Sequence, residues 1–177
     1  MPYINDQKRL EIERKVQGIK LGTGLSYPEN SLVDIANSLG AEVLSADLPP
    51  LEGKRVKGFI QWLPDEKRGE SPYSAKIYLN KNQSSTTRTF TLAHELGHFL
   101  LHKDNNNFRI DLEDYATDDS YNQETEANYF AGEILMPKEK FISVLKNAGN
   151  LDNVAEAFGV SVPAVGARMK WLRIAVS

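Results

Sequence analysis

Residues 91–102 have the sequence TLAHELGHFLLH, and this stretch contains all three histidines of the 177-residue chain. The apolar residues around the histidines predict a helix over 85–102. On such a helix His94 and His98 lie one turn apart on the same face, so both rings can bind one divalent ion. Glu95 is rotated by about 100° from His94, which suits a general base beside metal-activated water. The stretch therefore predicts a metal-binding HExxH helix.

The five-residue motif alone also fits a helix without a metal site, in which two histidines lie on the surface of an amphipathic helix. The flanking apolar residues argue against it; they are Leu92, Ala93, Leu96, Phe99, Leu100 and Leu101. They make the helix apolar almost all round, which is typical of a core helix. Two histidines and a glutamate buried there without a metal would be costly. Gly97 costs about 1 kcal/mol relative to alanine in a helix centre, so we expect another element to pack closely against it.

A catalytic zinc site usually takes a third protein ligand. The chain contains no cysteine to supply it. His102 follows His98 on the same helix, roughly 6 Å further along the axis, which is too far for the same ion. We therefore expect the third ligand to be a carboxylate from another element.

The best source of that carboxylate is the segment 123–135, QETEANYFAGEIL, which has helical periodicity. Glu124 falls inside the apolar arc of this helix, where a carboxylate needs a compensating cation. Asn128 lies one turn later on the same side and can take a ring N–H of a ligand histidine. Glu126 falls on the opposite side and is the reserve ligand. The alternative for Glu124 is an exposed acid in the first helical turn, favoured by the helix dipole.

The rest of the chain predicts further helices and strands. Helices are expected at 6–17, 32–39 and 120–135, with two or three short helices after 137, and strands are expected at 41–44, 58–63 and 75–80. A polar loop is expected at 103–119, followed by a capping box from Ser120 to Gln123. This order of elements predicts an α+β fold.

The composition is that of a folded protein. The apolar fraction of 41% and the net charge of −3 argue against disorder and against a broad phosphate-binding surface. The absence of cysteine excludes disulfides, thiolate zinc sites and a cysteine nucleophile. The first residues lack the apolar middle of a signal peptide, and no run approaches the roughly 18 apolar residues of a membrane span. We therefore expect one compact cytoplasmic domain with no membrane partner.

Three stretches together resemble the ImmA/IrrE family of metallo-endopeptidases, namely HELGHFLLH at 94–102, ETEANYFA at 124–131 and LMP at 135–137. The likeness covers roughly residues 25–140. It implies a small zincin-like fold of the gluzincin type, with a short mixed or antiparallel sheet packed on the HExxH helix and on the glutamate-bearing helix. The expected organisation is a single metallopeptidase domain, 1–177. Its core lies at about 25–140, with an N-terminal helix at 1–20 and a C-terminal helical extension at 141–177.

The resemblance also implies roles for single residues. The implied metal ligands are His94, His98 and Glu124, and the implied catalytic base is Glu95. Asn128 stands where related zincins often have aspartate. His102 matches a recurrent family histidine, for which we consider capping of the helix end and a substrate contact.

Characterised family members cleave helix-turn-helix repressors of the Xre type. The resemblance therefore implies a zinc-dependent endopeptidase that relieves repression of mobile-element or stress genes. The ligand types favour Zn²⁺, with Mn²⁺ as the alternative. We expect the substrate to add a strand to an exposed sheet edge such as 75–80. Tyr121 and Tyr78 are candidate donors to the oxyanion.

Two other functions compete with this interpretation. Residues 151–170 have the pattern of a helix-turn-helix with Gly159 in the turn, which is typical of a DNA-binding regulator. The second helix would begin with the residues VPAV, which offer few donors to base edges. Arg168, Lys170 and Arg173 could contact phosphates or simply solvate the helix. We expect this segment to pack against the peptidase core, or to dock the repressor, and do not expect direct nucleic-acid binding.

The other alternative is a metal-binding fold that does not cleave and acts as a toxin-like or scaffold partner of a repressor. Glu95 argues against this alternative, because metal storage needs no base at that position.

Overall fold

The computed structural model describes residues 4–67, 69–102, 108–112 and 121–175. The helices are α1 (Asp6–Thr23), α2 (Leu32–Ser38), α3 (Ser85–Leu101), α4 (Tyr121–Leu135), α5 (Lys138–Asn147), α6 (Leu151–Phe158) and α7 (Val162–Trp171), with a 3-10 turn at Asp65–Lys67. The strands are β1 (Ala41–Ala46), β2 (Val56–Trp62), β3 (Ala75–Asn80) and β4 (Phe108–Leu112). The predicted α+β class, with a mixed sheet and a C-terminal helical extension, is confirmed.

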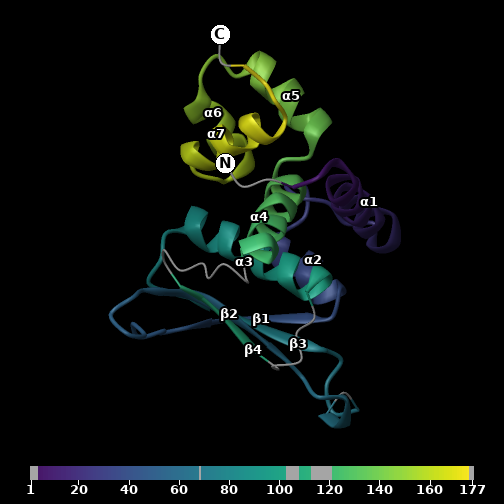
Figure 1. Cartoon of the computed structure of the whole chain (residues 1–177), viewed down its shortest axis with the longest axis vertical. Coiled ribbons are helices and arrows are strands. Elements are labelled where there is room, and N and C mark those ends of the chain that lie inside the picture. Colours follow the sequence, from purple (N-terminus) through teal and green to yellow (C-terminus); the bar gives the residue numbers. More distant parts are fainter. Residues whose placement is uncertain (1–3, 68, 103–107, 113–120, 176–177) are drawn as a thin grey trace.

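The elements are stacked in layers (Figure 1). The sheet forms one outer layer, α3 lies on it, α4 crosses α3, and the C-terminal helices α5, α6 and α7 lie farthest from the sheet. α1 packs along α4 at the side of the molecule. The glutamate-bearing helix is therefore enclosed between the HExxH helix on one side and the terminal helices on the other.

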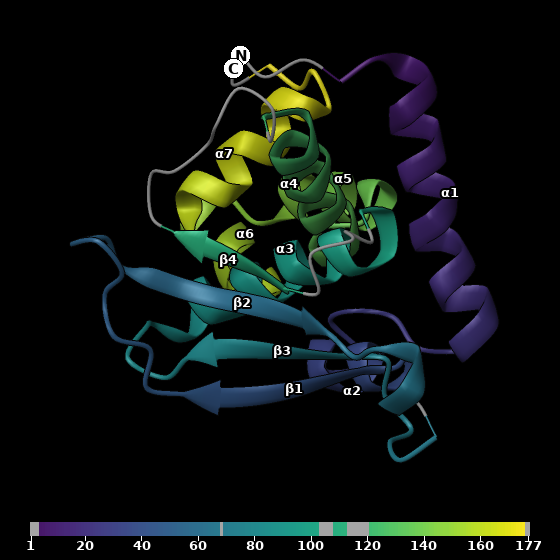
Figure 2. The same cartoon turned by 60° about the horizontal axis from the view of Figure 1, so that its bottom comes forward.

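The sheet has the strand order β1-β3-β2-β4, with β1 parallel to β3 and the other pairs antiparallel. Figure 2 shows β1 and β4 at opposite edges. The prediction that Ala75–Asn80 is an exposed edge is wrong, because β3 lies inside the sheet and is paired on both sides. Its pattern of alternating polar residues reflects a sheet face that the helices leave uncovered, and not an open edge.

The expected loop at 103–119 contains strand β4 at Phe108–Leu112. This strand pairs antiparallel with β2, from Gln61↔Phe108 to Val56↔Leu112. The pairing partner lies about fifty residues away in sequence, which local polarity does not reveal. Ser120, the start of the expected capping box, lies outside the described residues.

Two glycines permit the close approach of the layers. A Cβ at Gly58, beside an irregularity in the β2–β4 pairing, would lie 2.7 Å from the Tyr78 carbonyl oxygen and 2.9 Å from Cγ2 of Thr91 on α3. A Cβ at Gly97 would lie 3.2 Å from Cα of Ala127 on α4. The expectation that another element packs against Gly97 is confirmed, and that element is the helix that carries Glu124.

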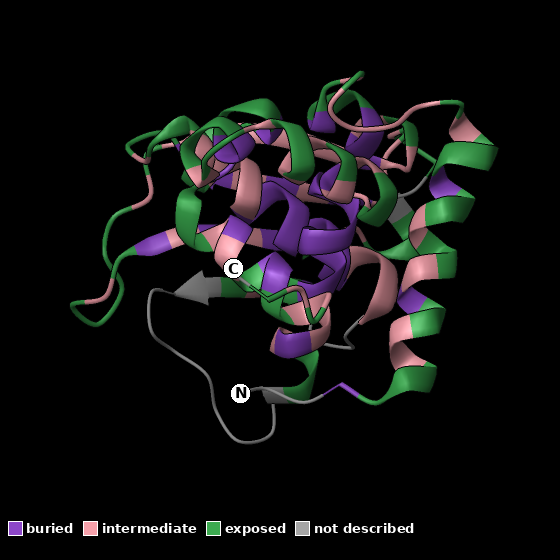
Figure 3. Cartoon of the chain, turned by 90° about the horizontal axis from the view of Figure 1, so that it is seen from above, coloured by how far each residue is buried: buried purple, intermediate pink, exposed green. Residues whose placement is uncertain are grey.

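The C-terminal helices pack against α4, as expected. Arg168 of α7 is 1% exposed, forms an ion pair with Glu133 of α4 and donates from Nε to the Met136 carbonyl oxygen at 3.0 Å. This arginine is therefore not available to a phosphate. Figure 3 shows the buried residues gathered in the central helices, while α1 exposes most of its outer side. Within the described ranges, no helix is both long and apolar enough to cross a membrane.

Candidate metal centre

The HExxH helix presents two histidine rings to one point. His94 and His98 are one turn apart on α3, and their Nε2 atoms lie 3.0 Å from each other. The two residues are 5% and 1% exposed. The histidines are therefore core side chains that share a face, and not surface residues of an amphipathic helix.

Helix α4 brings Glu124 to the same point. Its Oε2 lies 3.1 Å from Nε2 of His94, and its Oε1 lies 3.4 Å from Nε2 of His98. One ligand atom from each of the three residues lies within 4.8 Å of the others. Two ligands of a tetrahedral Zn²⁺, bound at about 2.0–2.1 Å, are separated by about 3.3 Å. The spacing and the donor types therefore fit a zinc ion.

The neighbours of the histidines determine which ring nitrogens carry protons. Nδ1 of His94 lies 2.9 Å from the amide oxygen of Asn128. Because that oxygen can only accept, Nδ1 of His94 carries a proton, and in the neutral ring Nε2 then carries the lone pair that a metal can bind. Asn128, one turn after Glu124, thus contacts the ring of His94, and its role in orienting a metal ligand stays a prediction.

A second chain of contacts reaches His98. Nδ1 of His98 lies 3.1 Å from Nδ1 of His102, and Nε2 of His102 lies 2.8 Å from a carboxylate oxygen of Glu126. The carboxylate accepts from His102 Nε2, so Nδ1 of His102 accepts from His98 and the Nε2 of His98 is again free of a proton. Lys8 of α1 lies 4.0 Å from the same Glu126 carboxylate.

Three groups with lone pairs therefore face one another in a buried site. Such an arrangement is repulsive unless a cation lies between them. The hydrogen bonds to Asn128 and His102 use the Nδ1 atoms and direct the two Nε2 atoms toward Glu124, where a metal would bind. The residues thus fit a divalent ion both in spacing and in protonation.

Burial and neighbouring side chains shift the pKa values of the residues in this site. Burial lowers the pKa of His98 to about 3 and also lowers the pKa of His102. Burial raises the pKa of Glu124, but its close contacts with the rings of His94 and His98 outweigh burial and hold this pKa well below its ordinary value. At neutral pH His98 is therefore uncharged and Glu124 is ionised, which are the forms that bind metals.

The remaining predicted residues lie in different places. Glu95 is fully buried on α3, next to His94. Glu126, the predicted reserve ligand, contacts His102. Tyr78 stacks on Phe59 with ring centroids 4.4 Å apart. It is wrong as an oxyanion donor, because it alternates with the β3 residues that face α3 and so lies on the far side of the sheet. The side chain of Tyr121 lies outside the described residues.

The sequence did not reveal Arg109. It lies on β4, forms an ion pair with Glu124 and donates from Nη1 to the Gln123 side chain at 2.8 Å. Strand β4 thus holds a guanidinium beside the predicted third ligand. The alternation of Phe108, Ile110 and Leu112 with polar residues was the available signal for a strand at this position.

Comparisons with known proteins place the fold and the site in context. Residues 36–170 match the family described as IrrE N-terminal-like domain, Peptidase_M78. A relative from Bacillus phage phi105, described as "uncharacterized immunity region protein 2", is 39% identical over 95 residues, which are 53% of this chain and 57% of the relative. The chain thus matches little more than half the length of that relative.

A solved structure described as a Mycobacterium tuberculosis transcriptional regulator superposes with a TM-score of 0.59 at 17% identity. The superposition covers 93% of this chain and 48% of the other, and at this identity the likeness concerns the fold alone. The family match, by contrast, extends over most of the chain and includes the HExxH helix and the glutamate-bearing helix. The chain therefore belongs to the IrrE N-terminal-like domain family of metallopeptidases, the ImmA/IrrE family.

Proposed function

We propose that this protein is a metallo-endopeptidase that cleaves a helix-turn-helix repressor. The observation that carries the proposal is the convergence of two proton-free histidine nitrogens and one carboxylate beside a buried glutamate. In this proposal His94, His98 and Glu124 hold the ion, and Glu95 is the catalytic base. The two nitrogen donors and one oxygen donor favour Zn²⁺ over Mn²⁺.

The ion would supply Lewis acidity, which activates water and polarises the scissile carbonyl group. The carboxylate of Glu95 accepts the proton of the attacking water and returns it to the departing amine. Asn128 and the His102–Glu126 pair fix the rings of His94 and His98, so that their Nε2 atoms stay free of protons. Burial of Glu95 within α3 restricts the carboxylate to few orientations.

The repressor substrate is supported by the family and not by a feature of the site. The ImmA/IrrE family is known for metallopeptidases that cleave repressors, and the phage relative is named for an immunity region. A binding protein that does not cleave would share the three ligands, but it would have no use for a base at position 95.

The test compares the wild-type protein with Glu95→Gln, both loaded with Zn²⁺, on a panel of purified Xre-type repressors. Glu95→Gln should slow cleavage by about 10²- to 10⁴-fold, the usual contribution of a general base. Its metal content, measured by inductively coupled plasma mass spectrometry, should stay unchanged. Glu139→Gln, at an acidic position in the first turn of α5, is the matched control and should cleave normally.

Two results would contradict the proposal. The first is cleavage by Glu95→Gln at the wild-type rate. The second is a wild-type protein with one equivalent of bound metal that leaves every repressor of the panel intact.

A further inference from the structure

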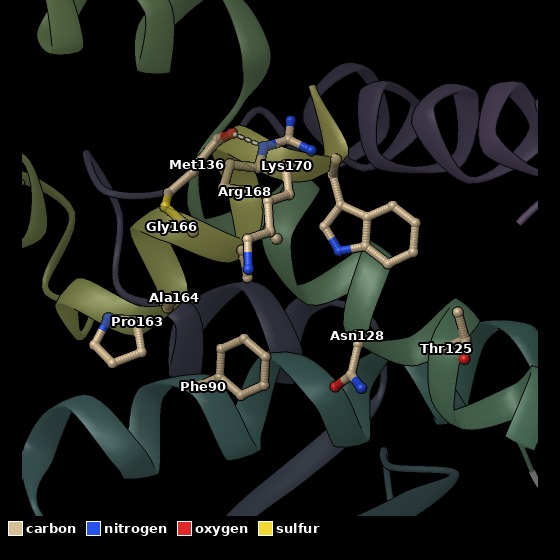
Figure 4. A pocket seen from close by; sticks show the side chains of 12 residues that line it. Phe90, Thr125, Asn128, Met136, Pro163, Ala164, Gly166, Arg168 and Lys170 are labelled. Carbon is tan, nitrogen blue, oxygen red and sulfur yellow. Dashed lines mark hydrogen bonds between the residues drawn. The ribbon is translucent and has the colours of Figure 1, made fainter. Parts of the chain in front are cut away.

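A cavity of about 660 Å³ lies beside the metal centre, between α3, α4 and α7. Its walls include Phe90 from α3, Asn128 and Gly132 from α4, and Ala164 and Gly166 from α7. Figure 4 shows Phe90, Asn128, Ala164 and Gly166 around one space, with α3 below it and α7 above. The volume lies within the range of about 300–1,000 Å³ that is typical of ligand pockets.

Two residues connect this cavity to the candidate ligands. Asn128 lines the cavity and also accepts from Nδ1 of His94, so a single side chain separates the cavity from that ring. Phe90 precedes His94 by one helical turn and lies on the same face of α3. A chain bound across the ion along α3 would therefore reach the cavity with a residue next to its scissile bond.

The lining residues that the structure describes are mostly apolar, and they include two cationic side chains, Arg168 and Lys170. Arg168 contributes its aliphatic stem, while its guanidinium is committed to Glu133 and to the Met136 carbonyl oxygen. The side chain of Lys170 extends into the cavity towards Phe90. Among the described residues that line the cavity there is no carboxylate. The chemistry thus matches a bulky apolar group that has a negative charge nearby.

We propose that this cavity is the specificity pocket of the site, which takes a large apolar side chain next to the scissile bond of a protein substrate, with Lys170 contacting a neighbouring acidic residue. The inference rests on the proposed peptidase function. The cavity exceeds the volume of one side chain, so it also leaves room for the flanking backbone. The pocket selects among sequences and does not take part in bond cleavage.

The chain offers two specific variants for a test. A Cβ at Gly166 would meet no atom within 4 Å, so Gly166→Phe fills the cavity without displacing the backbone of α7. Gly18→Phe is the matched control, because Gly18 is also a helical glycine with open space but does not line the cavity. Lys170→Glu reverses the charge, and Lys146→Glu, at an exposed position of α5, is its control.

The first measurement is cleavage of a mixture of random-sequence peptides by Zn²⁺-loaded protein, with the cut sites read by mass spectrometry. The wild type should prefer Leu, Phe or Met at one position beside the cut. Gly166→Phe should lower kcat/KM for such peptides by about tenfold or more relative to peptides with alanine there. Lys170→Glu should replace the preference for a nearby acidic residue by one for a basic residue. If the wild type cleaves and Gly166→Phe keeps the wild-type preference, the pocket assignment is overturned and the peptidase function stands.

The second measurement does not depend on cleavage. N-acetyl-leucine, which has an apolar side chain and a carboxylate, is titrated into the protein while backbone NMR shifts are recorded. Shifts should concentrate at Phe90, Asn128 and Ala164, persist in Gly18→Phe and disappear in Gly166→Phe. Absence of these shifts in the wild type overturns the pocket. If neither repressors nor peptides are cut, the peptidase function has failed, and this titration alone decides whether the pocket binds apolar anions.

Discussion

Two of the glutamates of helix α4, Glu124 and Glu133, lie on opposite sides of the helix and have different surroundings. Positions 124 and 133 are separated by two and a half turns, at about 3.6 residues per turn. Glu124 faces α3 and the two histidines, whereas Glu133 faces α7 and Arg168. The comparison between these two clusters indicates what distinguishes a structural ion pair from a candidate metal site.

The Glu133 cluster contains its own cation. Arg168 supplies a full positive charge and a second hydrogen bond to the Met136 carbonyl oxygen. The Glu124 cluster instead presents Nε2 of two imidazole rings to the carboxylate, and Arg109 contacts only the carboxylate itself. The Glu133 carboxylate, paired with a buried arginine, is therefore complete as a structural element. At Glu124 the ion pair with Arg109 balances the charge of the carboxylate, but it does not reach the two Nε2 atoms, and a divalent ion would bind both of them together with the carboxylate.

The largest expected loss of stability comes from breaking the ion pair between Glu133 and Arg168. Arg168→Met leaves Glu133 buried without a cation, and we expect the free energy of unfolding to fall by about 3–5 kcal/mol. Urea denaturation measures this loss. The double variant Glu133→Leu/Arg168→Met should recover most of it, since both charges are then removed. If Arg168→Met were as stable as the wild type, Arg168 would not be the cation that Glu133 requires.

The contribution of Glu124 to the free energy of unfolding should instead depend on bound metal. Zn²⁺ at 100 times its dissociation constant should raise the free energy of unfolding of the wild type by about 2.7 kcal/mol. Glu124→Ala should lose this stabilisation, which thermal denaturation with and without Zn²⁺ would detect. Glu139→Ala should retain it. Equal stabilisation of Glu124→Ala would show that Glu124 is not a ligand.

The hydrogen bonds that link His98 through His102 to Glu126 should have a smaller effect, which concerns the affinity for Zn²⁺. His102→Ala removes the acceptor of the His98 Nδ1 proton, and we expect the affinity for Zn²⁺ to fall by about 10- to 100-fold. Competition with a chromophoric chelator measures the affinity. His102→Gln, which can still accept at this position, should recover part of the loss. An unchanged affinity in His102→Ala would show that His102 does not support metal binding and serves only to end α3.

The smallest effect concerns Tyr129, on the Glu133 side of α4. Its hydroxyl donates to Glu13 at 2.5 Å and accepts from Arg9 at 3.4 Å, which joins α1 to α4. Tyr129→Phe should lower the free energy of unfolding by about 1 kcal/mol, the usual value of such hydrogen bonds. Zn²⁺ affinity should not change. A measurable loss of metal binding would mean that the two sides of α4 are coupled.

Local patterns in the sequence predicted the central part of the fold. The apolar flanks of His94 and His98 placed α3 in the core, and the cost of Gly97 predicted the close contact that Ala127 makes. The apolar arc of α4 predicted the side on which Glu124 meets the histidines. Each of these features depends on helical periodicity, which neighbouring residues determine. That the three side chains bind a metal remains a prediction.

Features that depend on distant contacts could not be predicted in this way. Strand β4 is defined by its pairing with β2, and the interior position of β3 depends on the order of the whole sheet. Glu126 lies away from the ligand side of α4 and still reaches His102, because His102 lies beyond the last turn of α3. Tyr129, on the same side as Glu126, is buried because α1 and α7 cover it.

The opposed positions of Glu124 and Glu133 constrain how this sequence can change in length. Inserting or deleting one residue between them would rotate one carboxylate by about 100° relative to the other. If the N-terminal end of α4 kept its packing, Arg168 would lose its partner. If the C-terminal end kept its packing, the histidines would lose Glu124. We therefore expect natural variation in length to be absent from this part of α4 and to occur in the connections between elements.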